Sequence, residues 1–151
     1  MREANLISMP VRFDIRRKEM LKTRRKSYAT DPSLVTLQRG STAPFDLGDI
    51  LETVAYNELV SRGYEVHTGK TYNGEIDFVV TNRVKRCYIQ VAYLLASEEV
   101  VEREFKAYSS VKDNWPKYVI SLDKPDFSQR GIIHMNVRNF LTGRRKLAIE
   151  P

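Results

Sequence analysis

The feature that most restricts the fold of this chain is a pair of β-type runs joined by a short turn. Residues 75–81 and 86–95 are rich in β-branched and aromatic side chains, and residues 82–85 separate them. Odd-numbered residues of the first run are expected on one face of a strand and even-numbered residues on the other. A turn centred on Arg83 and Val84 predicts an antiparallel hairpin in which Asp77 lies opposite Gln90.

Helical signals flank this hairpin on both sides. Asp46 is a good N-cap, and apolar residues then recur at helical spacing until Gly63 ends the helix. Ser97 is expected to cap a second helix, with Glu98 and Glu99 in its first turn, where the helix dipole favours acids. This second helix is expected to run to about residue 111.

Further strands complete the predicted order. Residues 64–68 form a short β-prone piece before the hairpin, and residues 117–122 form a strand after the second helix. From residue 46 to residue 122 the order is α-β-β-β-α-β, which predicts an α/β fold with a mixed sheet and a crossover helix. A small extra strand at 132–135 and a helix at 137–141 are expected to follow.

Charge is unevenly distributed along the chain of 151 residues, whose net charge is +6. Residues 1–45 hold ten Lys and Arg against four acids, and the remainder holds fifteen of each. Two basic runs stand out, Arg16-Arg17-Lys18 and Arg24-Arg25-Lys26, and such runs neutralise phosphates or form a solvated, partly mobile arm. We therefore expect a basic N-terminal arm or hairpin at 1–45, a domain at 46–142 and a basic tail at 143–151.

Several classes of protein are excluded by what the sequence lacks. Cys87 is the sole cysteine, so an intrachain disulfide and a four-cysteine zinc site are excluded. No apolar run approaches the roughly 20 residues that a membrane-spanning helix needs. Gly63 and the Gly69-Lys70-Thr71 run have the wrong spacing for a phosphate-binding P-loop, so no ATP site is expected in this chain. These features, and the absence of a signal peptide in the sequence, predict a cytoplasmic protein without membrane association.

One group of polar residues could carry chemistry. If Asp77 and Gln90 are opposite one another, their side chains lie about 5 Å apart and could share Mg²⁺, which prefers oxygen ligands. Glu52, from the preceding helix, could add a carboxylate at the edge of this site. The spacing alone favours the simpler interpretation that Glu75 and Asp77 are polar residues at the edge of a sheet, without a metal.

These residues resemble the pattern of the PD-(D/E)xK nucleases: a helical Glu, the strand motif G-E-I-D at 74–77, and a strand with (D/E/Q)-x-K. More specifically, the chain is similar to a large prokaryotic family, the C-terminal domain of unknown function attached to AAA-type P-loop ATPases. The segments that carry this resemblance are residues 47–59, 62–66, 69–71, 73–79, 88–95, 103–105 and 112–119. Residues 11–31 resemble the hairpin that ends the winged-helix region before this domain.

The resemblance implies a restriction-endonuclease-like αβββαβ core with named site residues. Glu52, Asp77 and Gln90 match the first three active-site positions, and Asp77 and Gln90, with Glu75 as companion, would be the Mg²⁺ ligands. The position of the nuclease lysine, which stabilises developing negative charge, holds Ala92. Lys70, in the preceding loop, could replace that lysine.

Two functions follow from this resemblance. The first is a nuclease-like, nucleic-acid-associated accessory domain of an AAA-type ATPase, present in cis or in trans; if active, it would be a Mg-dependent deoxyribonuclease. The alternative is a non-catalytic protein-interaction or regulatory domain of the ATPase. In that case aromatic residues would serve a partner surface: Tyr72, Tyr88, Tyr93 and Trp115.

Overall fold

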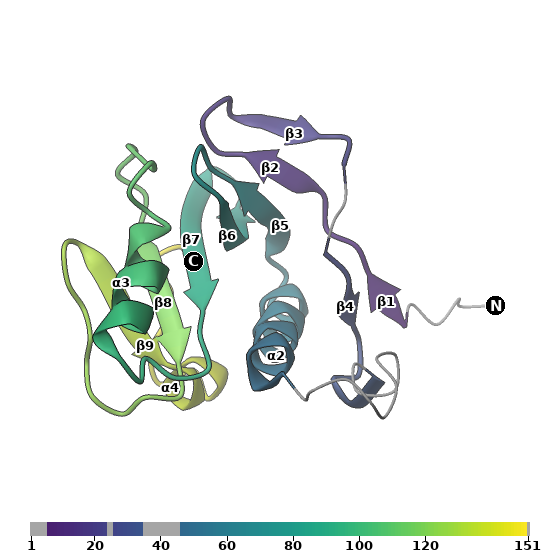
Figure 1. Cartoon of the computed structure of the whole chain (residues 1–151). Helices are drawn as coiled ribbons and strands as arrows, with labels where there is room; N and C mark the ends of the chain where they lie inside the picture. The colour runs from purple at the N-terminus through teal and green to yellow at the C-terminus, as the bar shows by residue number, and fades with distance from the viewer. Residues whose placement is uncertain (1–5, 24–25, 35–45, 151) are drawn as a thin grey trace.

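The computed structural model describes residues 6–23, 26–34 and 46–150. Within these residues the strands form a mixed seven-stranded sheet, in the order β3-β2-β5-β6-β7-β8-β9, and a separate ribbon of β1 and β4 (Figure 1). The strands are β1 (Ile7–Ser8), β2 (Arg12–Asp14), β3 (Glu19–Leu21), β4 (Tyr28–Ala29), β5 (Glu65–Lys70), β6 (Glu75–Asn82), β7 (Lys85–Val91), β8 (Lys117–Ser121) and β9 (Ile132–Asn136). The helices are α2 (Leu47–Ser61), α3 (Glu98–Lys106) and α4 (Val137–Leu141).

The two predicted helices begin where their caps were expected. The side chain of Asp46 accepts a hydrogen bond from the backbone N–H of Gly48 at 2.8 Å, and the side chain of Ser97 accepts one from Val100 at 3.3 Å. Gly63 has a φ of 82°, a conformation that glycine adopts without strain after a helix. The order from α2 to β8 is α-β-β-β-α-β, as predicted, and β9 and α4 follow.

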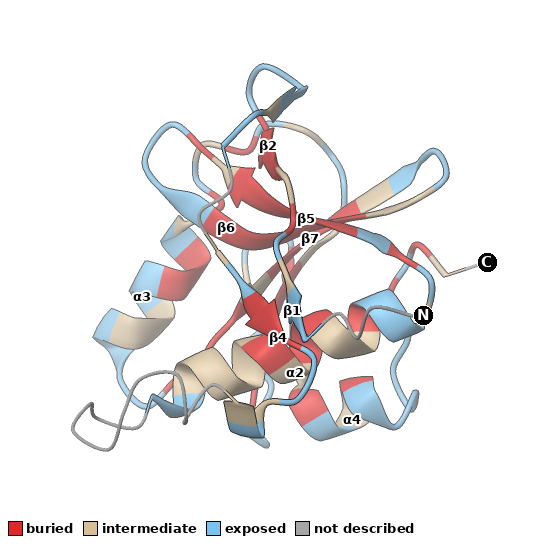
Figure 2. Ribbon diagram, turned by 90° about the vertical axis from the view of Figure 1, so that its right-hand side faces the viewer, coloured by how far each residue is buried: buried red, intermediate tan, exposed pale blue. Residues whose placement is uncertain are grey.

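Helices cover both faces of the sheet. Buried residues of α2 and α4 belong to one apolar cluster, whereas those of α3 belong to a second cluster on the opposite face. The central strands are buried along most of their length (Figure 2). This arrangement confirms the α/β class, because a sheet with an apolar surface on each face needs a covering layer on both.

The β6–β7 hairpin has the predicted register. Asn82 pairs with Lys85, so the turn consists of Arg83 and Val84, and Phe78 pairs with Ile89 further along. The continuation of this register places Asp77 next to Gln90 on neighbouring strands.

The prediction of simple alternation along β6 was wrong, because the strand carries a β-bulge. The pairs with β5 on either side of the irregularity are His67 with Val79 and Gly69 with Ile76. Two residues of β6, Asp77 and Phe78, therefore lie opposite one residue of β5. Ile76 and Val79 pack in the cluster on the α3 face, whereas Phe78 packs on the α2 face. The extra residue therefore changes the face of the sheet on which the side chains that follow it in β6 lie.

Gly69 pairs with Ile76 next to this bulge and is tightly enclosed. A Cβ atom at Gly69 would lie 3.0 Å from both Ile15 Cδ1 and Val79 Cγ2, closer than ordinary van der Waals contact. The glycine of the P-loop-like run thus permits three neighbouring strands to approach each other at the bulge.

Both ends of the described chain pack against the domain. β2 pairs with β3 in an antiparallel hairpin and in parallel with β5, so part of the N-terminal segment belongs to the main sheet. In the C-terminal segment, Arg144, Arg145 and Lys146 are exposed, whereas Leu147 and Ile149 are buried in the cluster on the α2 face. Among the described residues, no helix is long and apolar enough to cross a bilayer.

Candidate functional site

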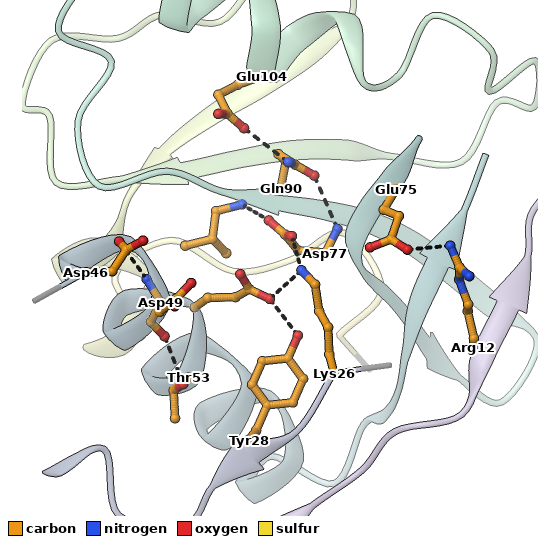
Figure 3. Close-up of polar contacts among 12 residues, drawn as sticks. Arg12, Lys26, Tyr28, Asp46, Asp49, Thr53, Glu75, Asp77, Gln90 and Glu104 are labelled. Atoms are coloured by element: carbon orange, nitrogen blue, oxygen red, sulfur yellow. Dashed lines mark hydrogen bonds and ion pairs between the residues drawn. The ribbon is translucent and has the colours of Figure 1, made fainter. Parts of the chain in front are cut away.

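The candidate site is an ion-paired centre formed by α2, the bulged strand β6 and the segment that leads into β4. Nζ of Lys26 lies 2.8 Å from Oε1 of Glu52 and 2.8 Å from Oδ1 of Asp77, between the two carboxylates (Figure 3). The side chains of Lys26, Glu52 and Asp77 are 30%, 14% and 9% exposed. The ammonium group therefore joins two carboxylates that are largely withdrawn from solvent.

Neutral groups complete the hydrogen bonding of this centre. The hydroxyl of Tyr28 donates to Oε1 of Glu52 at 2.6 Å, and the backbone N–H of Val91 donates to Oδ2 of Asp77 at 2.9 Å. Tyr28 is itself held by stacking on Tyr56 of α2, with ring centroids 4.2 Å apart. These contacts attach the N-terminal ribbon to α2 directly beside the carboxylates.

Burial controls the electrostatics of the centre. The pKa of Asp77 is raised to about 6, because burial and the nearby Glu52 carboxylate, which raise it, outweigh the Lys26 ammonium, which lowers it. For Lys26, burial lowers the pKa, but Asp77 and Glu52 together raise it above its ordinary value. Lys26 is consequently charged at every physiological pH, whereas Asp77 titrates near neutrality.

We expect the carboxyl carbon of Asp77 to titrate with a midpoint near pH 6 in a ¹³C NMR experiment. In Lys26→Met the midpoint should move to higher pH, because the cation that favours the ionised carboxylate is lost. Asp126, whose pKa is lowered by hydrogen bonds from Ser128, provides an internal reference that should not respond. A midpoint for Asp77 that is the same in both proteins would mean that Lys26 does not interact with it in solution.

Gln90 lies on the other face of the sheet from this centre. Its neighbours Tyr88 and Ala92 belong to the α3-face cluster, and its Nε2 donates to Glu104 of α3 at 3.1 Å. Its Oε1 accepts from the backbone N–H of Asp77 at 3.2 Å and does not meet the Asp77 carboxylate. The sequence hypothesis placed the two side chains together because it assumed regular alternation, whereas the bulge turns Asp77 towards α2.

Glu75 and Lys70 also have partners other than Asp77. Glu75 forms an ion pair with Arg12 of β2, and Nζ of Lys70 lies 4.0 Å from Oδ2 of Asp14. Ala92, at the position of the nuclease lysine, is buried, and its N–H donates to the carbonyl of Ile120. Among the lysines with described side chains, Lys26 is the one that contacts Asp77. The sequence did not indicate this contact, because Lys26 belongs to a basic run and such a run predicts solvent exposure.

These residues do not fit Mg²⁺ as they are arranged. Mg²⁺ needs several oxygen ligands in near-octahedral geometry. Oδ1 of Asp77 and Oε1 of Glu52 contact the Lys26 ammonium, and Gln90 faces α3. The described part of the chain contains no group of three or more His, Cys, Asp or Glu side chains that could hold a metal ion.

The basic residues singled out in the sequence occupy different positions. Arg16, Arg17 and Lys18 are exposed on the turn between β2 and β3, and Lys18 has a φ of 55°. Arg24 and Arg25 lie outside the described residues. Lys26 points inward to the carboxylates. Among the described residues of the two basic runs, the exposed positive charges are therefore those of Arg16, Arg17 and Lys18 on the β2–β3 turn.

The aromatic residues considered for a partner surface also differ from one another. Tyr72 is 77% exposed, whereas Tyr88 is fully buried and donates its hydroxyl to Asp113 at 2.6 Å. Tyr93 and Trp115 are each 38% exposed and lie on different loops. The four do not form one surface.

Comparison with known proteins shows a similarity over most of this chain. An uncharacterized protein of Haemophilus influenzae is 32% identical over 109 residues, which are 72% of this chain and 26% of that protein. The chain thus spans about a quarter of the length of the curated relative it matches. No protein-family model matches the sequence, and no solved structure matches it.

Proposed function

We propose that this chain is a nuclease-like accessory domain that associates with nucleic acid and whose carboxylate centre does not support metal-dependent cleavage. The observation that carries this proposal is the Lys26 ammonium, which lies 2.8 Å from both Glu52 and Asp77. A divalent cation would have to displace this ammonium before it could bind the same two carboxylates.

The order of elements supports the nuclease-like part of the proposal. From α2 to β8 it is that of the restriction-endonuclease-like core which the resemblance implies. Glu52 on the first helix and Asp77 on a bulged central strand lie close together, as the resemblance implies for the first two site positions. Bulges are common next to functional sites because they redirect a side chain.

Charge supports the association with nucleic acid. The chain has a net charge of +6 and a pI near 9.5, and its excess of basic residues lies in the N-terminal third. Arg16, Arg17 and Lys18 expose part of that charge on one turn. Such a cluster attracts phosphate without reading sequence.

The association with an AAA-type ATPase belongs to the same proposal. The Haemophilus influenzae relative is roughly four times as long as the matched region, which leaves room for a further module in that protein.

The second candidate function is that of a protein-interaction domain. It is favoured by three exposed apolar side chains near the N-terminus, those of Leu6, Met9 and Met20, each of which is more than half exposed.

A combined metal and DNA titration tests the proposal. We expect labelled linear and branched DNA to bind in a salt-dependent manner. The DNA should stay uncut with Mg²⁺ or Mn²⁺, because the Lys26 ammonium contacts the carboxylate oxygens that a metal ion would need. Mn²⁺ binding is measured in parallel by electron paramagnetic resonance, and Asp77→Ala serves as the control. Metal-dependent cleavage that disappears in Asp77→Ala would show instead that the centre is a working nuclease site. DNA binding that is absent at low salt would favour the protein-interaction function.

A further inference from the structure

Two turns that are far apart in the sequence lie side by side at one end of the sheet. β2 and β5 are parallel, and Asp14 at the end of β2 pairs with Lys70 at the end of β5. The N–H of Ile15 donates to the carbonyl of Lys70 at 3.0 Å, which extends this pairing into the turns. The two turns, residues 15–18 and residues 71–74, therefore lie at the same end of the sheet, because these parallel strands end side by side.

The contact between the two turns joins an exposed aromatic ring to a guanidinium group. Tyr72 is 77% exposed, and Cζ of Arg16 lies 5.8 Å from the centroid of its ring. The buried carboxylate of Asp14 accepts hydrogen bonds from the backbone N–H groups of Arg16 and Arg17, at 3.1 and 3.0 Å. The basic turn is therefore held in a defined conformation beside Tyr72 before any ligand binds.

A cavity of about 330 Å³ adjoins this contact. Thr71, Asn73 and Gly74, the neighbours of Tyr72 in its turn, line one side, and Arg103 and Lys106 of α3 line the other. Arg103 is 71% exposed and Lys106 is also exposed, so cations lie on both sides of the Tyr72 turn. Acidic groups of the cavity already have partners, since Glu104 accepts from Arg103 and Gln90, and Glu75 pairs with Arg12.

We propose that this surface, formed by the turns at 15–18 and 71–74 and the exposed end of α3, binds single-stranded nucleic acid. Tyr72 stacks on an unpaired base with one face of its ring, and Arg16 lies over the ring. The flanking phosphates contact Arg17 and Lys18 on one side and Arg103 and Lys106 on the other. An accessible ring beside fixed cations favours single strands, because the bases of a duplex already stack on each other. This inference rests on the proposed association with nucleic acid and specifies which form is preferred.

Fluorescence anisotropy of the full chain tests the inference with two probes of about a dozen nucleotides, an oligodeoxythymidylate and a duplex. We expect wild type to prefer the single strand, and Tyr72→Ala to weaken its binding about tenfold, since the stacking of one base on an aromatic ring is lost. Tyr72→Phe should retain wild-type affinity, because the phenyl face remains. Tyr93→Ala is the matched control, a partly exposed tyrosine on a different loop.

The possible outcomes separate the inference from the proposed function. Equal single-strand affinity in Tyr72→Ala and wild type, or a preference of wild type for the duplex, would overturn the stacking surface and leave nucleic-acid association intact. Binding of neither probe at low salt would overturn both. Loss of single-strand affinity in Tyr93→Ala to the same extent would also contradict a specific role for Tyr72.

Discussion

Replacement of Lys26 by methionine is expected to lower the free energy of unfolding by about 3 kcal/mol near pH 8, the lower end of what removal of one partner from a buried ion pair costs. The ammonium separates Asp77 and Glu52, whose side chains are 9% and 14% exposed. Without it, two carboxylates face each other away from solvent. Methionine keeps most of the length of the side chain, so lost packing contributes little.

The cost should depend on pH in a defined direction. The pKa of Asp77 is already raised from 3.8 to about 6, and the loss of Lys26 raises it further. A carboxyl whose pKa is higher in the folded state binds more protons when folded, so stability falls as the pH rises from about 4 through the folded pKa. The difference in unfolding free energy between Lys26→Met and wild type should therefore be small at about pH 4 and largest at about pH 8.

Urea denaturation at these two pH values measures the effect. Lys22→Met is a matched control, because Lys22 is exposed in the same segment and its loss should change stability by less than about 0.5 kcal/mol. Asp77→Asn in the Lys26→Met background should restore a substantial part of the loss at about pH 8, because a neutral amide no longer repels Glu52. A penalty that is unaffected by pH and by Asp77→Asn would attribute the effect to packing and contradict the electrostatic account.

Leu147→Ala is expected to destabilise the protein by about 3 kcal/mol, within the range for loss of a buried leucine side chain. Leu147 is 2% exposed and belongs to the apolar cluster on the α2 face. Neighbouring contacts hold its segment in place: the N–H of Ala148 donates to the hydroxyl of Tyr118, and Asn82 donates to the carbonyl of Ile149. Because these contacts hold the surroundings in place, truncation of the Leu147 side chain would leave a cavity.

Thermal or urea unfolding compares this variant with Leu141→Ala. Leu141 is 37% exposed at the end of α4, so its truncation should cost well under half as much. Equal effects of the two substitutions would mean that residues 143–150 do not pack on the domain in solution. A large effect of Leu147→Ala alone would place this segment within the folding unit and not in a basic tail.

Local patterns allowed much of the fold to be predicted. Asp46, Ser97 and Gly63 mark helix ends through backbone hydrogen bonds and a positive φ, which depend on a few neighbouring residues. The turn at Arg83 and Val84 set the hairpin register in the same way, and so placed Asp77 next to Gln90 on neighbouring strands. The resemblance also assigned Glu52 and Asp77 to one site, and in the structure both carboxylates contact Lys26.

The faces and partners of the site residues depended on contacts between distant segments. The bulge at Asp77 arises where β6 meets β5 around Gly69, a close approach that alternation along one strand does not encode. It turns Asp77 towards α2 and leaves Gln90 with Glu104. Lys26 looked like part of an exposed basic run, and it reaches the carboxylates because Tyr28 stacks on α2. Propensity and spacing act over a few residues, whereas ion pairs and packing join residues that are dozens of positions apart, so the composition of this centre emerges only when the sheet and helices are assembled.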